Sequence, residues 1–232
     1  MPNPTAIAEN IHQIRQKIVE LAAKYQRSAD DIQLLAVSKT MPVEAIQAAY
    51  EYGQRDFGEN YLQEALAKIH TLRHLDISWH FIGAIQSNKT REIANAFDWA
   101  HSIDRIKIAR RLSEQRNPEL APLNICLQIN ISNEKTKAGI QLNELAQVAR
   151  EIDRLPNLKL RGLMAIPEKT TGLDKQRSIF TKMHQAMTEL NHSGLDMDTL
   201  SMGMSNDMEA AIAEGATMVR IGTAIFGPRT QN

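Results

Sequence analysis

The sequence predicts an α/β fold, a single (β/α)8 TIM barrel with one extra helix at its N-terminal end. Short apolar segments alternate with amphipathic segments of helical length along the chain, a pattern typical of parallel strands joined by right-handed crossovers. Eight such strands fit within the 232 residues, which suits one closed barrel. We find no linker rich in Gly, Ser or Pro and no charge block. We therefore expect one domain over residues 1–232.

The first expected element is an amphipathic helix, which Pro4 and Thr5 open. Its apolar residues recur at alternating spacings of four and three, which is the helical period: Ile7, Ile11, Ile14, Ile18 and Leu21. The helix precedes the first strand, so we expect it to cover the bottom or the flank of the barrel.

The first strand, 34–37, is apolar without polar alternation, as a strand covered on both faces should be. Further strands are expected over 55–57, 79–82, 99–102, 124–131, 158–166, 199–202 and 218–221. Helices are expected over 43–52, 61–72, 89–97, 105–116, 142–155, 175–191 and 208–214. A doubly wound open sheet is the alternative architecture, because periodicity does not show closure.

The charge balance and the cysteine content narrow the class of protein. Lys plus Arg and Asp plus Glu both number 27, so no net field gathers nucleic acid or an anionic membrane. The single cysteine, Cys126, permits no intrachain disulfide. The sequence shows no basic-then-apolar leader and no apolar run long enough to span a bilayer. We expect a cytoplasmic protein with a small-molecule partner.

Functional side chains of such a barrel gather at the carboxyl ends of its strands. Lys39 follows the first strand. Partial desolvation there lowers the pKa of a lysine and frees the neutral amine to attack a carbonyl. A lone lysine in this position is more often a solvated charge. Lys39 therefore indicates a binding site only in combination with other residues.

The loops after the last two strands carry those other residues. Ser205, Gly222 and Thr223 occur where (β/α)8 barrels commonly bind phosphate through backbone N–H groups and hydroxyls. Arg220 is on the last strand, where it either contacts the ligand or forms a structural ion pair. A reactive lysine facing a phosphate site predicts a phosphorylated aldehyde as the ligand.

Six ordered motifs resemble those of the pyridoxal phosphate homeostasis protein family. They are AVSKT at 36–40, FGEN at 57–60, HFIG at 80–83 with QSNK at 86–89, LMAI at 163–166, SMGMSND at 201–207 and VRIGT at 219–223. The resemblance extends over nearly the whole chain. It implies a barrel similar to the N-terminal domain of alanine racemase.

The resemblance also implies pyridoxal 5′-phosphate (PLP) as the cofactor, bound as a Schiff base on Lys39. It implies phosphate contacts from Ser205, Gly222 and Thr223, as well as Arg220 near the pyridine nitrogen. A positive guanidinium there disfavours protonation of that nitrogen, so the ring becomes a poorer electron sink.

The remaining motif positions give less specific expectations. Asn60 resembles the polar contact near the phenolic oxygen. We include His80, Met164 and Met202 among the candidate cofactor-binding residues, the methionines as core side chains lining the barrel. Asn88 and Lys89 also match motif positions, and the sequence assigns them no individual contact.

The resemblance implies a carrier in cellular vitamin B6 homeostasis rather than an enzyme. We expect no second, β-rich domain of the kind that supplies the catalytic tyrosine of alanine racemase, with Tyr61 the tyrosine to check as its replacement. We expect a monomer that buffers PLP or delivers it to PLP-dependent apo-enzymes. An amino-acid racemase and a lysine-dependent aldolase acting on a sugar phosphate are the alternatives.

Overall fold

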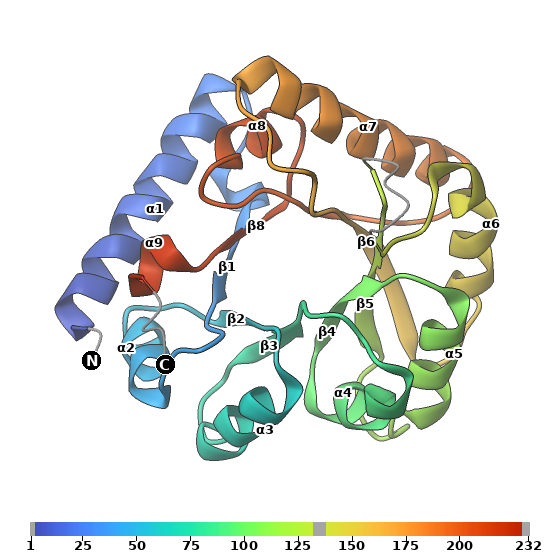
Figure 1. Ribbon diagram of the computed structural model, residues 1–232, viewed down its shortest axis with the longest axis horizontal. Helices are drawn as coiled ribbons and strands as arrows, with labels where there is room; N and C mark the ends of the chain where they lie inside the picture. The colour runs from blue at the N-terminus through green and yellow to red at the C-terminus, as the bar shows by residue number, and fades with distance from the viewer. Residues whose placement is uncertain (1–2, 132–137, 229–232) are drawn as a thin grey trace.

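Eight strands form one closed barrel in the computed structural model, which describes residues 3–131 and 138–228. Every neighbouring pair is parallel, and β8 pairs with β1 to complete the circle (Figure 1). The (β/α)8 barrel is thereby confirmed over the open sheet. The strands are β1 (Gln33–Val37), β2 (Asp56–Glu59), β3 (Ser78–Phe81), β4 (Trp99–Ile103), β5 (Leu123–Gln128), β6 (Leu158–Met164), β7 (Thr199–Ser201) and β8 (Met218–Ile221).

The predicted strand ends differ from the observed ones by up to three residues. Strand β2 continues to Glu59, whereas β5 ends at Gln128 rather than at residue 131. Ile129 and Ile131 nevertheless stay buried, and Ile129 forms an isolated bridge with Ile140. Ile129 also donates its N–H to the Met164 carbonyl at 2.8 Å. The apolar run is therefore longer than β5 because the residues that follow the strand remain packed against the barrel.

Helices surround the barrel at each predicted position. They are α1 (Pro4–Lys24), α2 (Val43–Glu51), α3 (Leu62–Thr71), α4 (Thr90–Ala96), α5 (Ile106–Gln115), α6 (Leu142–Asp153), α7 (Leu173–His192), α8 (Met208–Ala213) and the unpredicted α9 (Thr223–Phe226). The segment expected as a helix over 89–97 begins with a 3-10 turn at Ser87–Lys89. Within the described ranges, no helix combines the length and the apolar character needed to cross a membrane.

Helix α1 completes the ring of helices around the barrel, on the flank between α2 and α8. The helix that follows β8 is α9, which has only four residues, and α1 packs against α9, α8 and α2 (Figure 1). The predicted apolar stripe faces inward, since its five residues are all buried. The extra N-terminal helix thus takes the place of a long final crossover helix, and it covers the flank rather than the bottom.

The hydrophobic core has two layers. A large cluster fills the space between the strands and the helices, and it includes Leu34 and Ala36 of β1. Leu35 and Val37, which alternate with them, belong to a separate small cluster. Because successive strand side chains point to opposite faces, this second cluster lies inside the barrel. Every second side chain of a strand therefore points into the barrel interior. This alternation determines which strand residues can line a cavity there.

Candidate functional site

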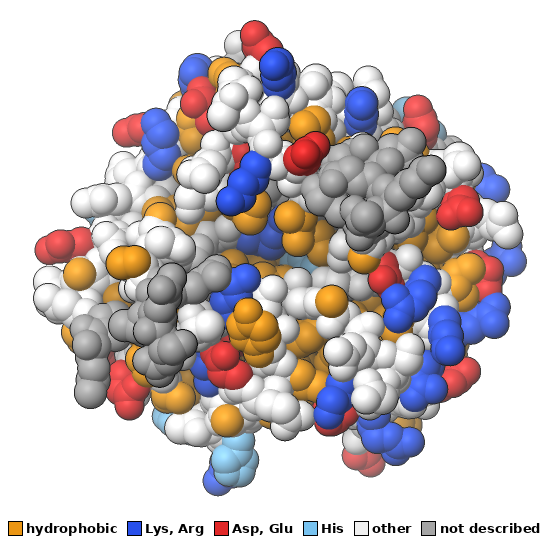
Figure 2. Space-filling view, in the orientation of Figure 1, with side chains coloured by type: hydrophobic (Ala, Val, Ile, Leu, Met, Phe, Trp, Pro, Cys, Tyr) orange, Lys and Arg blue, Asp and Glu red, His pale blue; other side chains and the backbone are white. Residues whose placement is uncertain are grey.

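A cavity of about 1030 Å³ opens at the carboxyl ends of the strands. The face shown in Figure 2 is hollowed near its centre, where hydrophobic and basic side chains lie together. The cavity brings together seven of the nine candidate residues, which are Lys39, Asn60, Met164, Ser205, Arg220, Gly222 and Thr223. Residues from β1, β2, β6, β7 and β8 or the loops after them thus meet at one place, as expected of a barrel.

The backbone on both sides of Lys39 is anchored by helix α3. The Lys68 ammonium donates to the carbonyl of Ser38 at 2.8 Å, and Glu64 accepts from the Thr40 N–H at 2.6 Å. Thr40 has φ +65°, a left-handed conformation that costs energy for a β-branched residue. The two contacts oppose that cost and fix the turn that carries Lys39.

Lys68 itself is buried within an ionic cluster. Its ammonium lies 2.8 Å from Glu59 Oε1 and 2.5 Å from Glu64 Oε1, and the Ser38 hydroxyl donates to Glu59 at 2.7 Å. Burial raises the pKa of the Glu59 carboxyl, an effect that Lys68 opposes. A buried pair of this kind is costly to break, because removing one partner leaves the other charge without compensation. We therefore regard the cluster as the support of the Lys39 turn.

Asn60 has a side-chain atom suited to a ligand. Its Oδ1 is buried and has no hydrogen-bond partner among the described residues, which is unusual for a buried polar atom. Gly83 fixes its position, since a Cβ at residue 83 would lie 2.2 Å from the Asn60 carbonyl oxygen. An N–H or O–H donor of a ligand in the cavity would satisfy this acceptor.

The loops after β7 and β8 form a cradle of hydroxyls and backbone N–H groups. Gly222 precedes α9, and a Cβ there would lie 3.1 Å from the Val37 carbonyl oxygen, so the backbone is packed closely beside β1. Asp207 accepts from the Met204 N–H at 2.6 Å and thereby holds the loop that carries Ser205. Thr223 supplies a second hydroxyl. These groups fit a phosphate, which is best bound by hydroxyls and free N–H donors.

Arg220 is buried at 5% exposure and reaches the cavity from inside the barrel. Its guanidinium donates to the Ser201 carbonyl, to the Ser201 hydroxyl at 2.8 Å and to the Ala165 carbonyl at 2.8 Å. Burial lowers the pKa of Arg220 to about 10, so the group stays charged at neutral pH. Among the described residues it forms no ion pair. Because its partners are neutral, contact of Arg220 with a ligand is favoured over a structural ion pair.

Two candidate residues lie outside the lining of the cavity. Met202 is fully buried in the cluster between the strands and the helices. His80 lies inside the barrel, with its ring nitrogens 3.0 Å from His101 and 3.1 Å from Asp56. Asn88 and Lys89 are in the 3-10 turn before α4, also outside the lining. The role of His80 and Met202 in cofactor binding stays a prediction, and Asn88 and Lys89 have no assigned contact.

Some residues around the site escaped the sequence analysis. The loop between β6 and α7 supplies one wall, which consists of Ile166, Pro167, Glu168, Lys169, Thr170, Thr171 and Gly172. Lys68 and His101 also went unnoticed. A lysine three residues after Ala65 on the buried face of α3 was the available signal for Lys68, and for His101 it was a histidine within a wholly buried strand.

The family model for the alanine racemase N-terminal domain matches residues 3–230. The pyridoxal phosphate homeostasis protein of Pseudomonas aeruginosa is 55% identical over 225 residues, covering 97% of this chain and 96% of that protein. The protein of the same name from Escherichia coli K12 is 53% identical over 226 residues, covering 96% and 97%. The chain belongs to this family of pyridoxal phosphate homeostasis proteins, built on the alanine racemase N-terminal domain.

Solved structures agree with this assignment. PipY from Synechococcus elongatus, solved with PLP bound, has a TM-score of 0.84 and 36% identity, and the match covers 95% of this chain and all of PipY. The alanine racemase of Clostridium difficile has a TM-score of 0.75 at 16% identity. That match covers all of this chain but 59% of the racemase. At this identity, the racemase shares the fold alone.

We predict that the protein loses stability in weak acid because His80 and His101 are buried. Burial is the main cause that lowers the pKa values of both His80 and His101 from the ordinary 6.5, and that of His101 most. Below pH 6.5 the unfolded chain therefore binds protons that the folded chain does not. The stabilisation is present above pH 6.5 and is lost as pH falls toward the lowered folded values, by up to about 1.4 kcal/mol per unit for each histidine.

We expect urea titrations between pH 7.5 and 5.5 to show this decline in the free energy of unfolding. The slope should become shallower in His101→Gln. The control is His12→Gln, which replaces an exposed histidine of α1 and should leave the slope unchanged. A slope in His101→Gln as steep as in the wild type contradicts the prediction.

Proposed function

We propose that this chain is a PLP carrier: a barrel domain that holds PLP covalently on Lys39 and serves intracellular PLP homeostasis. The observation that carries the proposal is the convergence on one cavity of a lysine, an unsatisfied Asn60 oxygen and a cradle of hydroxyls and backbone N–H groups. The relatives named as homeostasis proteins and the PLP-bound PipY structure support it.

The residues divide the binding task among them. The Lys39 amine condenses with the cofactor aldehyde, forming a carbon–nitrogen double bond and releasing one water. Ser205, Thr223 and the backbone at Gly222 bind the phosphate, while Asn60 contacts the ring oxygen. PLP when bound supplies an aldehyde and an electron-withdrawing ring.

Arg220 directs the site away from carbanion chemistry. A guanidinium carries five N–H donors and no acceptor, so it donates to the pyridine nitrogen and keeps that nitrogen unprotonated. The ring then withdraws electrons weakly. The described lining of the cavity also contains neither tyrosine nor histidine to serve as a second base, and Tyr61 is exposed outside it. Storage or delivery of the cofactor fits these residues better than racemisation.

We further propose that the protein acts in the cytoplasm as a monomer and that PLP-dependent apo-enzymes are its partners. The balanced charge, with 27 basic and 27 acidic residues, supports transient contact with neutral protein surfaces rather than with nucleic acid.

Replacement of Lys39 should abolish covalent attachment. We expect Lys39→Ala to give no cofactor adduct after borohydride reduction, as measured by intact-protein mass. The matched control is Lys169→Ala, which removes a second lysine that lines the same cavity and should give the wild-type adduct. An adduct of undiminished yield in Lys39→Ala contradicts the proposed attachment.

The cradle after β7 and β8 should recognise the phosphate specifically. Thr223→Val and Ser205→Ala should each weaken PLP binding about tenfold, since a hydrogen bond to a charged group contributes roughly 1.5 kcal/mol or more. Binding of pyridoxal, which has no phosphate, should hardly change. Thr170→Val, which replaces a threonine of the loop between β6 and α7 in the same lining, is the control. Equal losses for PLP and pyridoxal would assign these residues to another part of the ligand.

Exchange at the α-carbon distinguishes a carrier from a racemase. We expect the loaded protein to exchange the α-hydrogen of a panel of amino acids in D2O no faster than free PLP does, because the site lacks a strong electron sink. Proton NMR follows the exchange. Rapid exchange of any one amino acid would favour an enzyme.

A further inference from the structure

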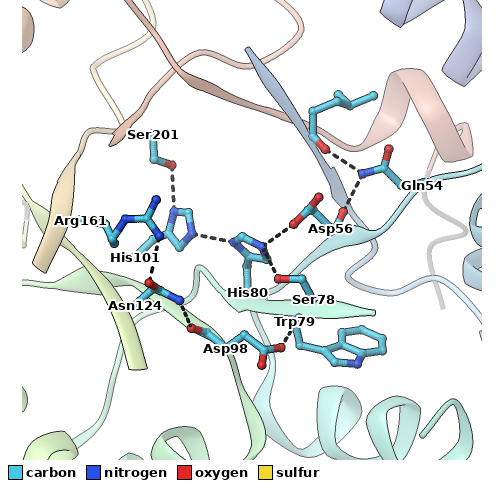
Figure 3. Close-up of polar contacts among 11 residues, drawn as sticks. Gln54, Asp56, Ser78, Trp79, His80, Asp98, His101, Asn124, Arg161 and Ser201 are labelled. Carbon is cyan, nitrogen blue, oxygen red and sulfur yellow. Dashed lines mark hydrogen bonds and ion pairs between the residues drawn. The ribbon is translucent and has the colours of Figure 1, made fainter. Parts of the chain in front are cut away.

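A chain of buried polar side chains crosses the barrel interior from Arg220 to Asp56. Arg220 Nη1 lies 2.8 Å from Ser201 Oγ, which lies 2.8 Å from His101 Nδ1. His101 Nε2 lies 3.0 Å from His80 Nδ1, and His80 Nε2 lies 3.1 Å from Asp56 Oδ1 (Figure 3). The serine and both histidines are fully buried. The chain thus links five strands, β8, β7, β4, β3 and β2, through the barrel.

The two ends of the chain lie at opposite ends of the barrel. Arg220 lines the cavity at the carboxyl ends of the strands. Asp56 is the first residue of β2 and lines a depression of about 410 Å³ that lacks any residue of the cavity wall. The side chain of Asp56 is 20% exposed. A change at Asp56 therefore makes no direct contact with the cavity. Its effect must pass through the intervening side chains, through the backbone of β2 that leads to Asn60, or through the field of its charge.

The chemistry of the two ends sets the direction of every hydrogen bond between them. A guanidinium only donates, so Ser201 Oγ accepts from Arg220. An ionised carboxylate only accepts, so His80 carries its proton on Nε2, facing Asp56. Its Nδ1 is then an acceptor, and the Nε2–H of His101 donates a hydrogen bond to it. The Ser201 hydroxyl in turn donates to His101 Nδ1.

The opposite direction leaves like groups facing each other. A proton on His101 Nδ1 would make His101 Nε2 an acceptor, so His80 would carry its proton on Nδ1. His80 Nε2 would then present a lone pair to the Asp56 carboxylate. The Ser78 hydroxyl, also 3.1 Å from this nitrogen, can donate to it but leaves the two acceptors facing each other, which is costly in the interior. A doubly protonated ring on either histidine would place a second buried cation near Arg220. With both rings neutral and protonated on Nε2, every contact in the chain joins a donor to an acceptor.

We propose that His101 and His80 are positioning residues for Arg220, acting through a hydrogen-bond chain polarised from the guanidinium to Asp56. The chain orients the Ser201 hydroxyl so that its lone pairs face Arg220, and this fixes the guanidinium in the cavity wall. This inference rests on the proposed function, in which Arg220 meets the pyridine nitrogen of PLP. Residues that never touch the cofactor thus set the electronic environment of its ring.

The tautomers can be tested without cofactor. Nitrogen-15 NMR of the histidine rings in cofactor-free protein at pH 7 should show His80 and His101 neutral and protonated on Nε2. His101→Phe and His80→Phe assign the two resonances. A cationic ring or an Nδ1–H tautomer at either position would overturn the polarity and the proposal with it. This readout holds whether or not the protein binds PLP.

The long-range effect needs a matched pair of variants. Asp56→Asn removes the charged acceptor at the end of the chain. Asp98→Asn removes the same charge near the same end of the barrel, where Asp98 accepts from the Trp79 N–H outside the chain (Figure 3). We expect Asp56→Asn to weaken PLP binding two- to threefold and to shift the absorption of the bound cofactor, whereas Asp98→Asn changes neither.

His101→Phe interrupts the chain closer to Arg220 and should weaken PLP binding about tenfold, with a larger spectral shift. Cys126→Ala removes a buried side chain from the same interior and leaves the hydrogen-bond chain intact, so it measures the effect of the lost packing alone. The proposal is overturned if Asp56→Asn and Asp98→Asn behave alike, or if His101→Phe binds PLP with the wild-type spectrum and affinity. Failure of the wild-type protein to take up PLP would instead refute the proposed function.

Discussion

The buried ammonium of Lys68 is the contact on which the geometry around Lys39 depends. It lies between the carboxylates of Glu59 and Glu64 and donates to the carbonyl of Ser38, so it joins the ends of β1 and β2 to helix α3. Each charge is stable in the interior because the others compensate it. The turn that presents Lys39 is therefore held by three elements. A reactive amine needs this kind of support, because small errors in its position weaken attack on a bound aldehyde.

Closure of the barrel brings Lys39 and the proposed phosphate-binding loops together. Lys39 and Gly222 are far apart in sequence, yet β8 pairs with β1 and places Gly222 against Val37. An open sheet would separate these two strands at its edges. Helix α1 makes the closed form possible at this seam, because it packs beside the short α9 where a long final helix would otherwise lie.

Much of the site followed from the sequence, because strand ends can be located by periodicity. Lys39, Ser205, Gly222 and Thr223 come within three residues after predicted strands, and all of them line the cavity. His80 and Met202 are also near strand ends, but they lie outside the lining, in the barrel interior and in the outer cluster. Periodicity locates the end of a strand more reliably than the direction of each side chain there.

The supporting contacts could not be read from the sequence. The His101 ring and the Ser201 hydroxyl are separated by 100 residues, and Lys68 reaches Ser38 from 30 residues away. Such pairs depend on the register between strands and on which face of a helix is buried. The tertiary structure alone supplies both.

The central claim is that Lys39 holds PLP in the cavity at the mouth of the barrel. The most direct measurement is the near-ultraviolet and visible absorption of purified protein incubated with PLP, before and after borohydride reduction, followed by peptide mapping of the reduced product. We expect an absorption band that borohydride abolishes and a single modified residue, Lys39. A protein that stays colourless with added PLP, or an adduct that maps to another lysine, would contradict it.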